Sequence, residues 1–553
     1  MILSKPPGSV VRGEKVVDAT QRASQLRQGL EESARSHAFK FNAQNTRAAA
    51  PITTPPAAGS VNYDEHQREL IAATDRVVIG EAVAGSGKTT TAIGFAAARS
   101  KARFLYMSFG RANSDEARRK FGPNVKASTT HAIAFAALGH KYKDRLPKSS
   151  SWRPREIAEA LGIENQTAAC VARTLASFYA STDSEINENH LGNLGNWNLT
   201  PVEQSHVLDQ ARVAWTKIIE PGSNLPVTHD TYLKLWSLSK PRLDYDYIIL
   251  DEAQDTNPLT EQLVLSQLDH CKLLAIGDRH QSIYGFRGAT NAMQNLRSIE
   301  GSRVVTMPRT WRFGPKTADI ANKLLHNLKD ESISIIGMGK DGGWKSQSTL
   351  LTRTNAGLFD EAVSRKGIGL HWLGGVGNYN LAIILDAHSL WADARHAVRD
   401  PFMKRFRSWS EVVDYAESTR DAETKMLIKV VERYKNDTPK LVDQVIKNEV
   451  RDAAAANMVL TTAHKAKGME WDCVRIGNDF NFLFEAEEEF CTEGCLAQET
   501  QQEVNLLYVA ITRARQMCML NDETQEWLKE LPKLQADRLR LAAMGAQESV
   551  RTP

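Results

Sequence analysis

The sequence lacks the features of secreted, membrane-spanning and strongly basic proteins. Its six cysteines are scattered over 553 residues, which argues against a disulfide-built scaffold and suits a reducing compartment. No apolar run reaches the roughly 18 residues of a membrane-spanning helix, and the N-terminus lacks the apolar block of a secretory signal. The formal net charge is only +3, so any surface for nucleic acid must be a local groove.

Two local patterns favour plain surface structure over a special site. Cys491 and Cys495 are close in sequence, but no histidine or third cysteine stands nearby. Two loop thiols are therefore favoured over a zinc or iron–sulfur site. The acidic run from Glu485 to Glu489 is interpreted as a solvated loop.

A glycine-rich segment separates an apolar run from a helical one. Gly85-Ser86-Gly87-Lys88-Thr89 follows the run Val77-Val78-Ile79, which predicts a strand, a phosphate loop and a helix. Glycines let backbone N–H groups approach phosphate oxygens, Lys88 adds charge at the β and γ phosphates, and the Thr89 hydroxyl can reach Mg²⁺. The loop departs from the usual pattern at Ala82, where a glycine normally stands.

A second apolar run, residues 247–250, ends abruptly in Asp251 and Glu252. In enzymes with a phosphate loop, a carboxylate at such a strand end holds Mg²⁺ and its neighbour polarises the attacking water. The competing interpretation is a core strand that runs into a solvated acidic turn. The phosphate loop upstream favours the first interpretation, and together the two segments predict hydrolysis of a nucleoside triphosphate.

A third strand-like run, residues 272–276, leads into a loop from Gly277 to Ala289 that combines an amide, an aromatic ring and a cation. Gln281 can sense a γ-phosphate, Phe286 offers a face on which a base can stack, and Arg287 can pair with a backbone phosphate. For Phe286 taken alone, a core position is the favoured alternative.

The alternation of strand and helix patterns predicts an α/β fold with two parallel-sheet cores, each interrupted by a mostly helical insertion. The second sheet is expected to start at the strand Arg303-Val304-Val305. The expected segments are a flexible arm (1–60), the first core (61–123 and 225–300), its insertion (124–224), the second core (301–366 and 452–530), its insertion (367–451) and a C-terminal tail (531–553).

Taken in order, these motifs resemble those of the UvrD/Rep group of superfamily 1 DNA helicases, and the resemblance implies two RecA-like cores. It extends to His464-Lys465-Ala466-Lys467-Gly468-Met469-Glu470-Trp471 and to the run from Leu507 to Arg515. The resemblance implies catalytic roles for Lys88, Glu252, Gln281, Arg312 and Arg513, and Mg²⁺ ligation by Thr89 and Asp251. The implied nucleotide-binding residues are Gln67, Ala84, Gly85, Ser86, Gly87, Lys88, Thr89, Thr90, Trp311 and Glu470. The implied DNA-binding residues are Phe109, Arg111, Thr130, His131, Phe286, Arg287, Arg353 and His464.

Within this group, two segments look most similar to the helicase portion of the F-box DNA helicases. They are the run from Leu225 to Trp236 and the run from Glu503 to Tyr508, in which Asn505 stands where most UvrD/Rep proteins have arginine. No F-box is visible in the first sixty residues.

The resemblance implies an ATP- and Mg²⁺-dependent DNA helicase or translocase with 3′-to-5′ polarity, acting in DNA repair, recombination or replication. The candidate arginine fingers lie in one core and the catalytic carboxylates in the other, so closure of the cores would complete the ATP site. One alternative is a translocase that displaces bound proteins from single strands and unwinds weakly. Another is a nucleotide-gated binding module or effector.

The expected partners are single-stranded DNA and junctions between duplex and single strands, bound by a monomer. The N-terminal arm could recruit a protein partner, and no membrane is expected to be involved. We expect a soluble protein, cytoplasmic in a prokaryote or nuclear in a eukaryote. The composition of the arm does not distinguish an export address from a plain tail.

Overall fold

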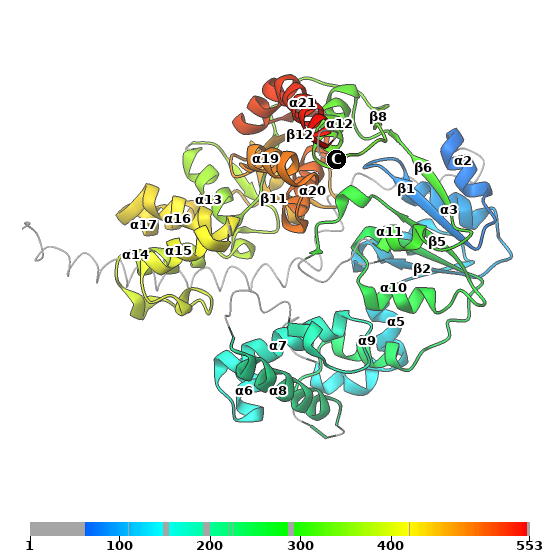
Figure 1. Ribbon diagram of the computed structural model, residues 1–553, viewed down its shortest axis with the longest axis horizontal. Helices are drawn as coiled ribbons and strands as arrows, with labels where there is room; N and C mark the ends of the chain where they lie inside the picture. Colours follow the sequence, from blue (N-terminus) through cyan, green and yellow to red (C-terminus); the bar gives the residue numbers. More distant parts are fainter. Residues whose placement is uncertain are drawn as a thin grey trace, which may run out of the picture. The chain divides into compact units, whose positions relative to one another are not determined.

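The computed structural model describes residues 61–108, 110–146, 154–191, 199–220, 222–223, 225–285, 292–365, 367–419 and 421–549. The chain divides into two compact units between Trp311 and Arg312, here called the N-terminal and the C-terminal unit. Each is labelled by its elements in Figure 1. The expected arm (1–60) and the predicted DNA-binding residues Phe109, Phe286 and Arg287 lie outside the described residues.

The N-terminal unit is built on a six-stranded sheet in the order β3-β2-β4-β5-β1-β6, and all of its pairings are parallel. Its strands are β1 (Val77–Ala82), β2 (Phe104–Ser108), β3 (Val125–Thr129), β4 (Tyr247–Asp251), β5 (Lys272–Gly277) and β6 (Arg303–Met307). The inner strands are buried almost throughout, as expected for a parallel sheet with both faces covered.

Helices cover both faces of this sheet. Successive residues of β1 point to opposite faces, so Val77 and Ile79 join one apolar cluster and Val78 joins another. The cluster around Val78 is formed with α2 (Glu65–Ala72), α3 (Lys88–Ala97) and α4 (Arg111–Lys120). The other face packs on α5 (Thr130–Ala137), α6 (Pro154–Leu161), α7 (Asn165–Ala180), α8 (Pro201–Ile219), α9 (His229–Leu238), α10 (Pro258–Leu265) and α11 (Ala292–Arg297).

The C-terminal unit has a second parallel sheet, of five strands in the order β10-β11-β9-β12-β13. The strands are β9 (Ser348–Thr352), β10 (Leu370–Trp372), β11 (Met458–Thr462), β12 (Trp471–Ile476) and β13 (Ala514–Met519). Around it lie α12 (Pro315–Leu328), α13 (Asn355–Ser364), α18 (Ala463–Ala466), α19 (Leu483–Glu493), α20 (Gln498–Ile511) and α21 (Asp522–Ser549). The insertion contributes α14 (Ala382–Trp391), α15 (Trp409–Thr419), α16 (Ala422–Tyr434) and α17 (Thr438–Lys447). Two parallel-sheet cores therefore confirm the predicted fold class.

Several predicted boundaries are wrong. The strand at Arg303 does not open the second sheet, because β6 pairs with β1 in the first, with Val78 opposite Arg303. Likewise β3 belongs to the first sheet although it was expected in the first insertion, and β10 belongs to the second sheet although it was expected in the second insertion. The sequence of a short apolar strand does not show which sheet it joins, because sheet membership depends on the neighbouring strand with which it pairs.

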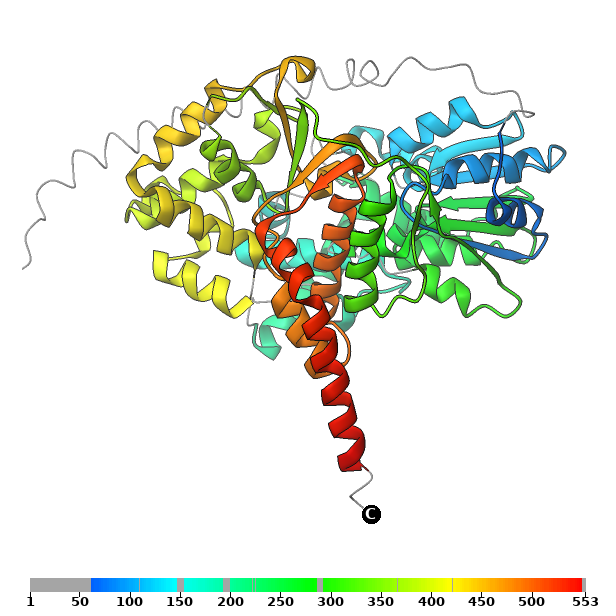
Figure 2. The ribbon, with the colours of Figure 1, turned by 90° about the horizontal axis from the view of Figure 1, so that it is seen from above.

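The expected C-terminal tail from residue 531 is the greater part of a helix, because α21 runs without a break from Asp522 to Ser549. Figure 2 shows it in red as one long helix. Over the residues that the structure describes, no helix is at once long and apolar enough to span a bilayer.

The acidic run is not a solvated loop either, because it lies within the helix α19. Glu487 is buried there, with 3% of its surface exposed. Its carboxylate pairs with Arg538 of α21 and accepts a hydrogen bond from Trp527 Nε1 at 3.2 Å. The guanidinium of Arg538 also donates to the carbonyl of Asn327, at the end of α12. A helical spacing thus turns one glutamate of the run inward, where it joins α19, α21 and α12.

We expect Glu487→Ala to lower the free energy of unfolding by about 3–5 kcal/mol, because it leaves the partly buried Arg538 without its carboxylate. The neighbouring Glu488 is exposed, so Glu488→Ala is the matched control and should change stability by no more than about 0.5 kcal/mol. Denaturant unfolding of both variants beside the wild type measures the difference. Equal stabilities for the two variants would contradict the assigned role of Glu487.

Candidate nucleotide-binding site

The segment between β1 and α3 has the backbone of an anion cradle. Gly85 and Gly87 take φ values of 77° and 81°, a left-handed conformation that favours glycine. Gly87 is the N-cap of α3 and supplies no side-chain cap to the first turn. The Ser86 hydroxyl is buried and makes no hydrogen bond. The helix terminus and this hydroxyl are therefore suited to the oxygens of a phosphate chain.

Two predicted nucleotide contacts lie against this loop within the N-terminal unit. The Trp311 backbone N–H donates to Gly85 O at 3.2 Å, and the residue is 45% exposed, which leaves an aromatic face open for stacking. The Gln67 amide is engaged at both ends, because Oε1 accepts from Asp64 N at 3.0 Å and Nε2 donates to Ser86 O at 3.1 Å. Gln67 therefore stabilises the loop through these two hydrogen bonds, and its contact with the nucleotide stays a prediction.

Asp251 ends β4 as a buried carboxylate with 6% of its surface exposed. One oxygen, Oδ2, accepts a hydrogen bond from the hydroxyl of Tyr106 on β2, and Oδ1 is buried without a hydrogen-bond partner. Burial raises the pKa of Asp251, and the neighbouring Glu252 carboxylate raises it further. A hard cation at Oδ1 would relieve both effects, so the arrangement fits a Mg²⁺ ligand. Tyr106 was missed by sequence reasoning, since only the pairing of β2 with β4 brings it to Asp251.

Glu252 is turned out of the strand by a left-handed backbone conformation, with φ of 51°, which is uncommon for a residue other than glycine. Its Oε2 lies 3.6 Å from Nζ of Lys88, the first residue of α3. The same oxygen accepts a hydrogen bond of 2.6 Å from Nε2 of Gln254. The structure therefore brings the predicted lysine and the predicted base together at the phosphate loop.

Gln281, the predicted phosphate sensor, is buried just beyond β5. Its Nε2 donates to Asp278 Oδ2 at 2.7 Å, and the Asp278 N–H donates to Gln254 Oε1 at 3.0 Å. Gln254 was not predicted as a site residue, although it stands in the same run as the two carboxylates. The motif indicated its location, but only the structure reveals its partners.

The C-terminal unit gathers a second set of predicted residues. Arg312 Nε donates to Glu470 Oε2 at 2.9 Å, and its NH1 donates to the carbonyl of Thr512 at 3.2 Å. Arg513, which follows Thr512 in the chain, is 1% exposed and donates to the carbonyls of Val509 and Met469 at 3.0 and 3.2 Å. Two predicted catalytic arginines and Glu470, which is predicted to bind the nucleotide, thus form one cluster.

Several predicted DNA-binding residues lie at the carboxyl ends of β2 and β3. A small pocket of about 50 Å³ there is lined by Ser108, Thr130 and His131, and by residues that sequence reasoning missed, among them Thr256, Asn257 and Thr260. His131 Nε2 lies 2.8 Å from the Asp230 carboxylate, and Arg111 lies on α4 with 91% of its side chain exposed. Contact with DNA by these side chains stays a prediction.

The predicted DNA contacts of the C-terminal unit have less freedom. Arg353 forms a bidentate ion pair with Glu503, through Nε and NH2 at 2.6 Å each, and only 20% of its side chain is exposed. Burial lowers the pKa of His464 to about 4, with further lowering by Arg353 and Lys467. A neutral His464 can donate or accept a hydrogen bond, but it brings no charge to a phosphate at neutral pH.

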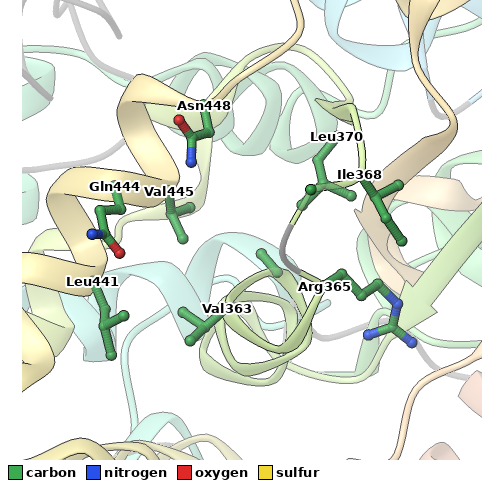
Figure 3. A pocket seen from close by; sticks show the side chains of 10 residues that line it. Val363, Arg365, Ile368, Leu370, Leu441, Gln444, Val445 and Asn448 are labelled. Atoms are coloured by element: carbon green, nitrogen blue, oxygen red, sulfur yellow. The ribbon is translucent and has the colours of Figure 1, made fainter.

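A larger pocket, of about 410 Å³, lies elsewhere in the C-terminal unit (Figure 3). Val363 of α13, Ile368 and Leu370 near β10, and Leu441 and Val445 of α17 form its apolar lining. None of the predicted site residues lines it. The predicted site residues therefore lie apart from this pocket.

Comparison with known proteins connects this geometry to a family. Residues 63–300 match the UvrD/REP helicase N-terminal domain, and residues 386–522 match the UvrD-like helicase C-terminal domain. The chain is 33% identical to F-box DNA helicase 1 of Gallus gallus over 519 residues, which is 85% of this chain and 49% of that protein. It is 29% identical to F-box DNA helicase protein 1 of Schizosaccharomyces pombe, over 83% of this chain and 58% of that protein. With DNA helicase II of Escherichia coli, it is 26% identical over 48% of this chain and 40% of that protein.

The chain spans about half the length of the two F-box helicases that it matches. Both family domains occur in the expected order: the first covers β1 to β5 of the six-stranded sheet, and the second covers β11 to β13 of the five-stranded sheet. Because these matches agree with the predicted motifs, the chain belongs to the UvrD/Rep family of helicases.

Proposed function

We propose that this chain is an ATP- and Mg²⁺-dependent DNA translocase that unwinds duplex DNA with 3′-to-5′ polarity. The observation that carries the proposal is the convergence of Lys88, Asp251 and Glu252 at one phosphate loop. The names of the relatives, which are DNA helicases, support the choice of DNA as the substrate. The polarity is inferred from the resemblance to the UvrD/Rep group.

In this proposal the phosphate loop binds the β and γ phosphates of ATP, and Trp311 stacks on the adenine. Asp251, through its unpartnered Oδ1, and the Thr89 hydroxyl would hold Mg²⁺. Bound there, the ion would offset negative charge on the phosphates and on the buried carboxylate.

The proton of the attacking water is accepted by Glu252, which lies beside the Lys88 ammonium. That ammonium stabilises the charge that develops on the γ-phosphate, and Gln281 contacts the same group. Arg312 and Arg513 act as arginine fingers from the C-terminal unit. Because these arginines and the carboxylates belong to different units, binding and hydrolysis of ATP would drive the units through a cycle.

The DNA strand is held by His131 and Thr130 in the N-terminal unit and by His464 in the C-terminal unit. Arg353 could contact a backbone phosphate if it exchanged its Glu503 partner, because a guanidinium binds carboxylates and phosphates with the same fork. Stacking and phosphate contacts would make the grip tolerant of sequence. Single strands and junctions are the proposed substrates, with repair, recombination or replication as the setting.

The two charged partners at the phosphate loop should respond differently to substitution. Lys88→Ala should reduce ATPase activity to below roughly a tenth of the wild-type rate, because it removes a contact to the developing charge. Glu252→Gln should still bind Mg·ATP but hydrolyse it at least about 100-fold more slowly, because the general base is lost while Asp251 remains. Nucleotide titrations and single-turnover hydrolysis measure the two effects separately. Loss of nucleotide binding in Glu252→Gln would show that the carboxylate roles are misassigned.

Unwinding of tailed duplexes tests the direction of movement. A duplex with a 3′ single-stranded tail should be unwound in the presence of ATP, and one with a 5′ tail should remain intact. The same preparation is also tested for displacement of a protein bound to a single strand. Strong displacement with weak unwinding would favour a protein-stripping translocase, and neither activity would favour a nucleotide-gated binding module.

A further inference from the structure

We propose that Gln254 is a positioning residue that joins the general base Glu252 to the loop that carries Gln281. The inference rests on the function proposed above, from which the roles of Glu252 and Gln281 are taken. The observation behind it is a continuous series of hydrogen bonds, from Glu252 through Gln254 and Asp278 to Gln281.

The partners of Gln254 determine how its amide is oriented. Its carbonyl oxygen Oε1 must face the Asp278 backbone N–H, at 3.0 Å, because that group can only donate. Its Nε2 must then face the Glu252 carboxylate, at 2.6 Å, because an ionised carboxylate can only accept. Rotating the amide by 180° would set two donors and two acceptors against each other. The amide can therefore serve both partners in only one orientation.

The surroundings leave Gln254 little room to move. It is fully buried, with 0% of its surface exposed, and its backbone carbonyl accepts a hydrogen bond from the Ser282 hydroxyl at 3.1 Å. A Cβ atom at Gly277, the last residue of β5, would lie only 2.3 Å from Gln254 Oε1. Only glycine at position 277 leaves room for the Gln254 side chain. The amide is therefore packed between the ends of β4 and β5.

The arrangement gives a physical route between the phosphate and the base. Gln281 donates to Asp278 Oδ2 at 2.7 Å, so a shift of Gln281 toward a γ-phosphate would pull on Asp278. The backbone of Asp278 is tied to Gln254, and Gln254 orients the oxygen of Glu252 that faces Lys88. The base would therefore reach its hydrolytic position only when the Gln281 loop is in place.

Gln254→Met tests this link, because methionine keeps the length of the side chain and removes both hydrogen bonds. The loss of such a supporting contact should slow single-turnover ATP hydrolysis by about 10–100-fold. Affinity for Mg·ATP, measured by titration with a fluorescent ATP analogue, should change by less than about threefold, since Lys88 and Asp251 remain. The factor by which single-stranded DNA stimulates hydrolysis should also fall.

Gln267 provides a matched control in the same unit. It is also a buried glutamine, 1% exposed, whose amide donates to the carbonyls of Pro241 and Leu263 and accepts from the N–H of Leu243. Gln267→Met should lower the melting temperature but leave hydrolysis and its stimulation by DNA at wild-type values. Identical kinetics for Gln254→Met and Gln267→Met would overturn the proposal.

A double-mutant cycle with Gln281→Ala separates a positioning role from general damage. If Gln254 acts through the Gln281 loop, the double variant should hydrolyse ATP about as slowly as the slower single variant. If the two losses multiply, the residues act independently and the link is refuted. Should Gln254→Met melt far below the control, hydrolysis is compared at a temperature at which both variants are fully folded.

Glu252→Gln, measured alongside, distinguishes failure of this inference from failure of the proposed function. Wild-type hydrolysis by Glu252→Gln would remove the base role itself. Inactive Glu252→Gln together with fully active Gln254→Met would leave the base role intact and refute only the link.

Discussion

The site depends on the parallel pairing of β1, β5 and β4, which brings three strand ends to one edge of the first sheet. The register sets Glu81 opposite Gly277 and Asp251 opposite Ile276, so the phosphate loop, the two carboxylates and the Asp278 loop all emerge side by side. In an open α/β sheet this edge is where ligands bind. The groups that a phosphate chain and a metal would need are therefore assembled by the register of backbone hydrogen bonds before any ligand arrives.

The sequence was enough to predict the local parts of this site. Glycines at 85 and 87 require a special backbone, and a buried strand that ends in Asp251-Glu252 is rare enough to indicate chemistry. Contacts between residues on different strands could not be predicted from the sequence. From the sequence, Tyr106 is indistinguishable from an ordinary core aromatic, and only the pairing of β2 with β4 brings it to Asp251. Gln254 likewise looks like part of an acidic turn, and only the structure shows its amide between Glu252 and Asp278.

The fold was predicted in class but not in its boundaries, for a related physical reason. A three-residue strand such as β10, or one with an exposed end such as β6, owes its sheet to its neighbour and not to its own composition. Glu487 shows the same limit on a helix, where one glutamate of an acidic run faces inward because Arg538 and Trp527 meet it. Charge and periodicity predict the type of a segment, but its burial and its sheet depend on the residues that it contacts in the folded chain.

The proposed helicase function requires that ATP hydrolysis at this nucleotide site respond to DNA. The most direct test is the steady-state ATPase rate of the wild-type protein, measured with Mg²⁺ in the absence and in the presence of single-stranded DNA. We expect slow hydrolysis alone and a rise of at least about tenfold with saturating single strands, because bound DNA would favour the hydrolytically active state. An ATPase rate that is unchanged by DNA, or no hydrolysis under either condition, would contradict this expectation.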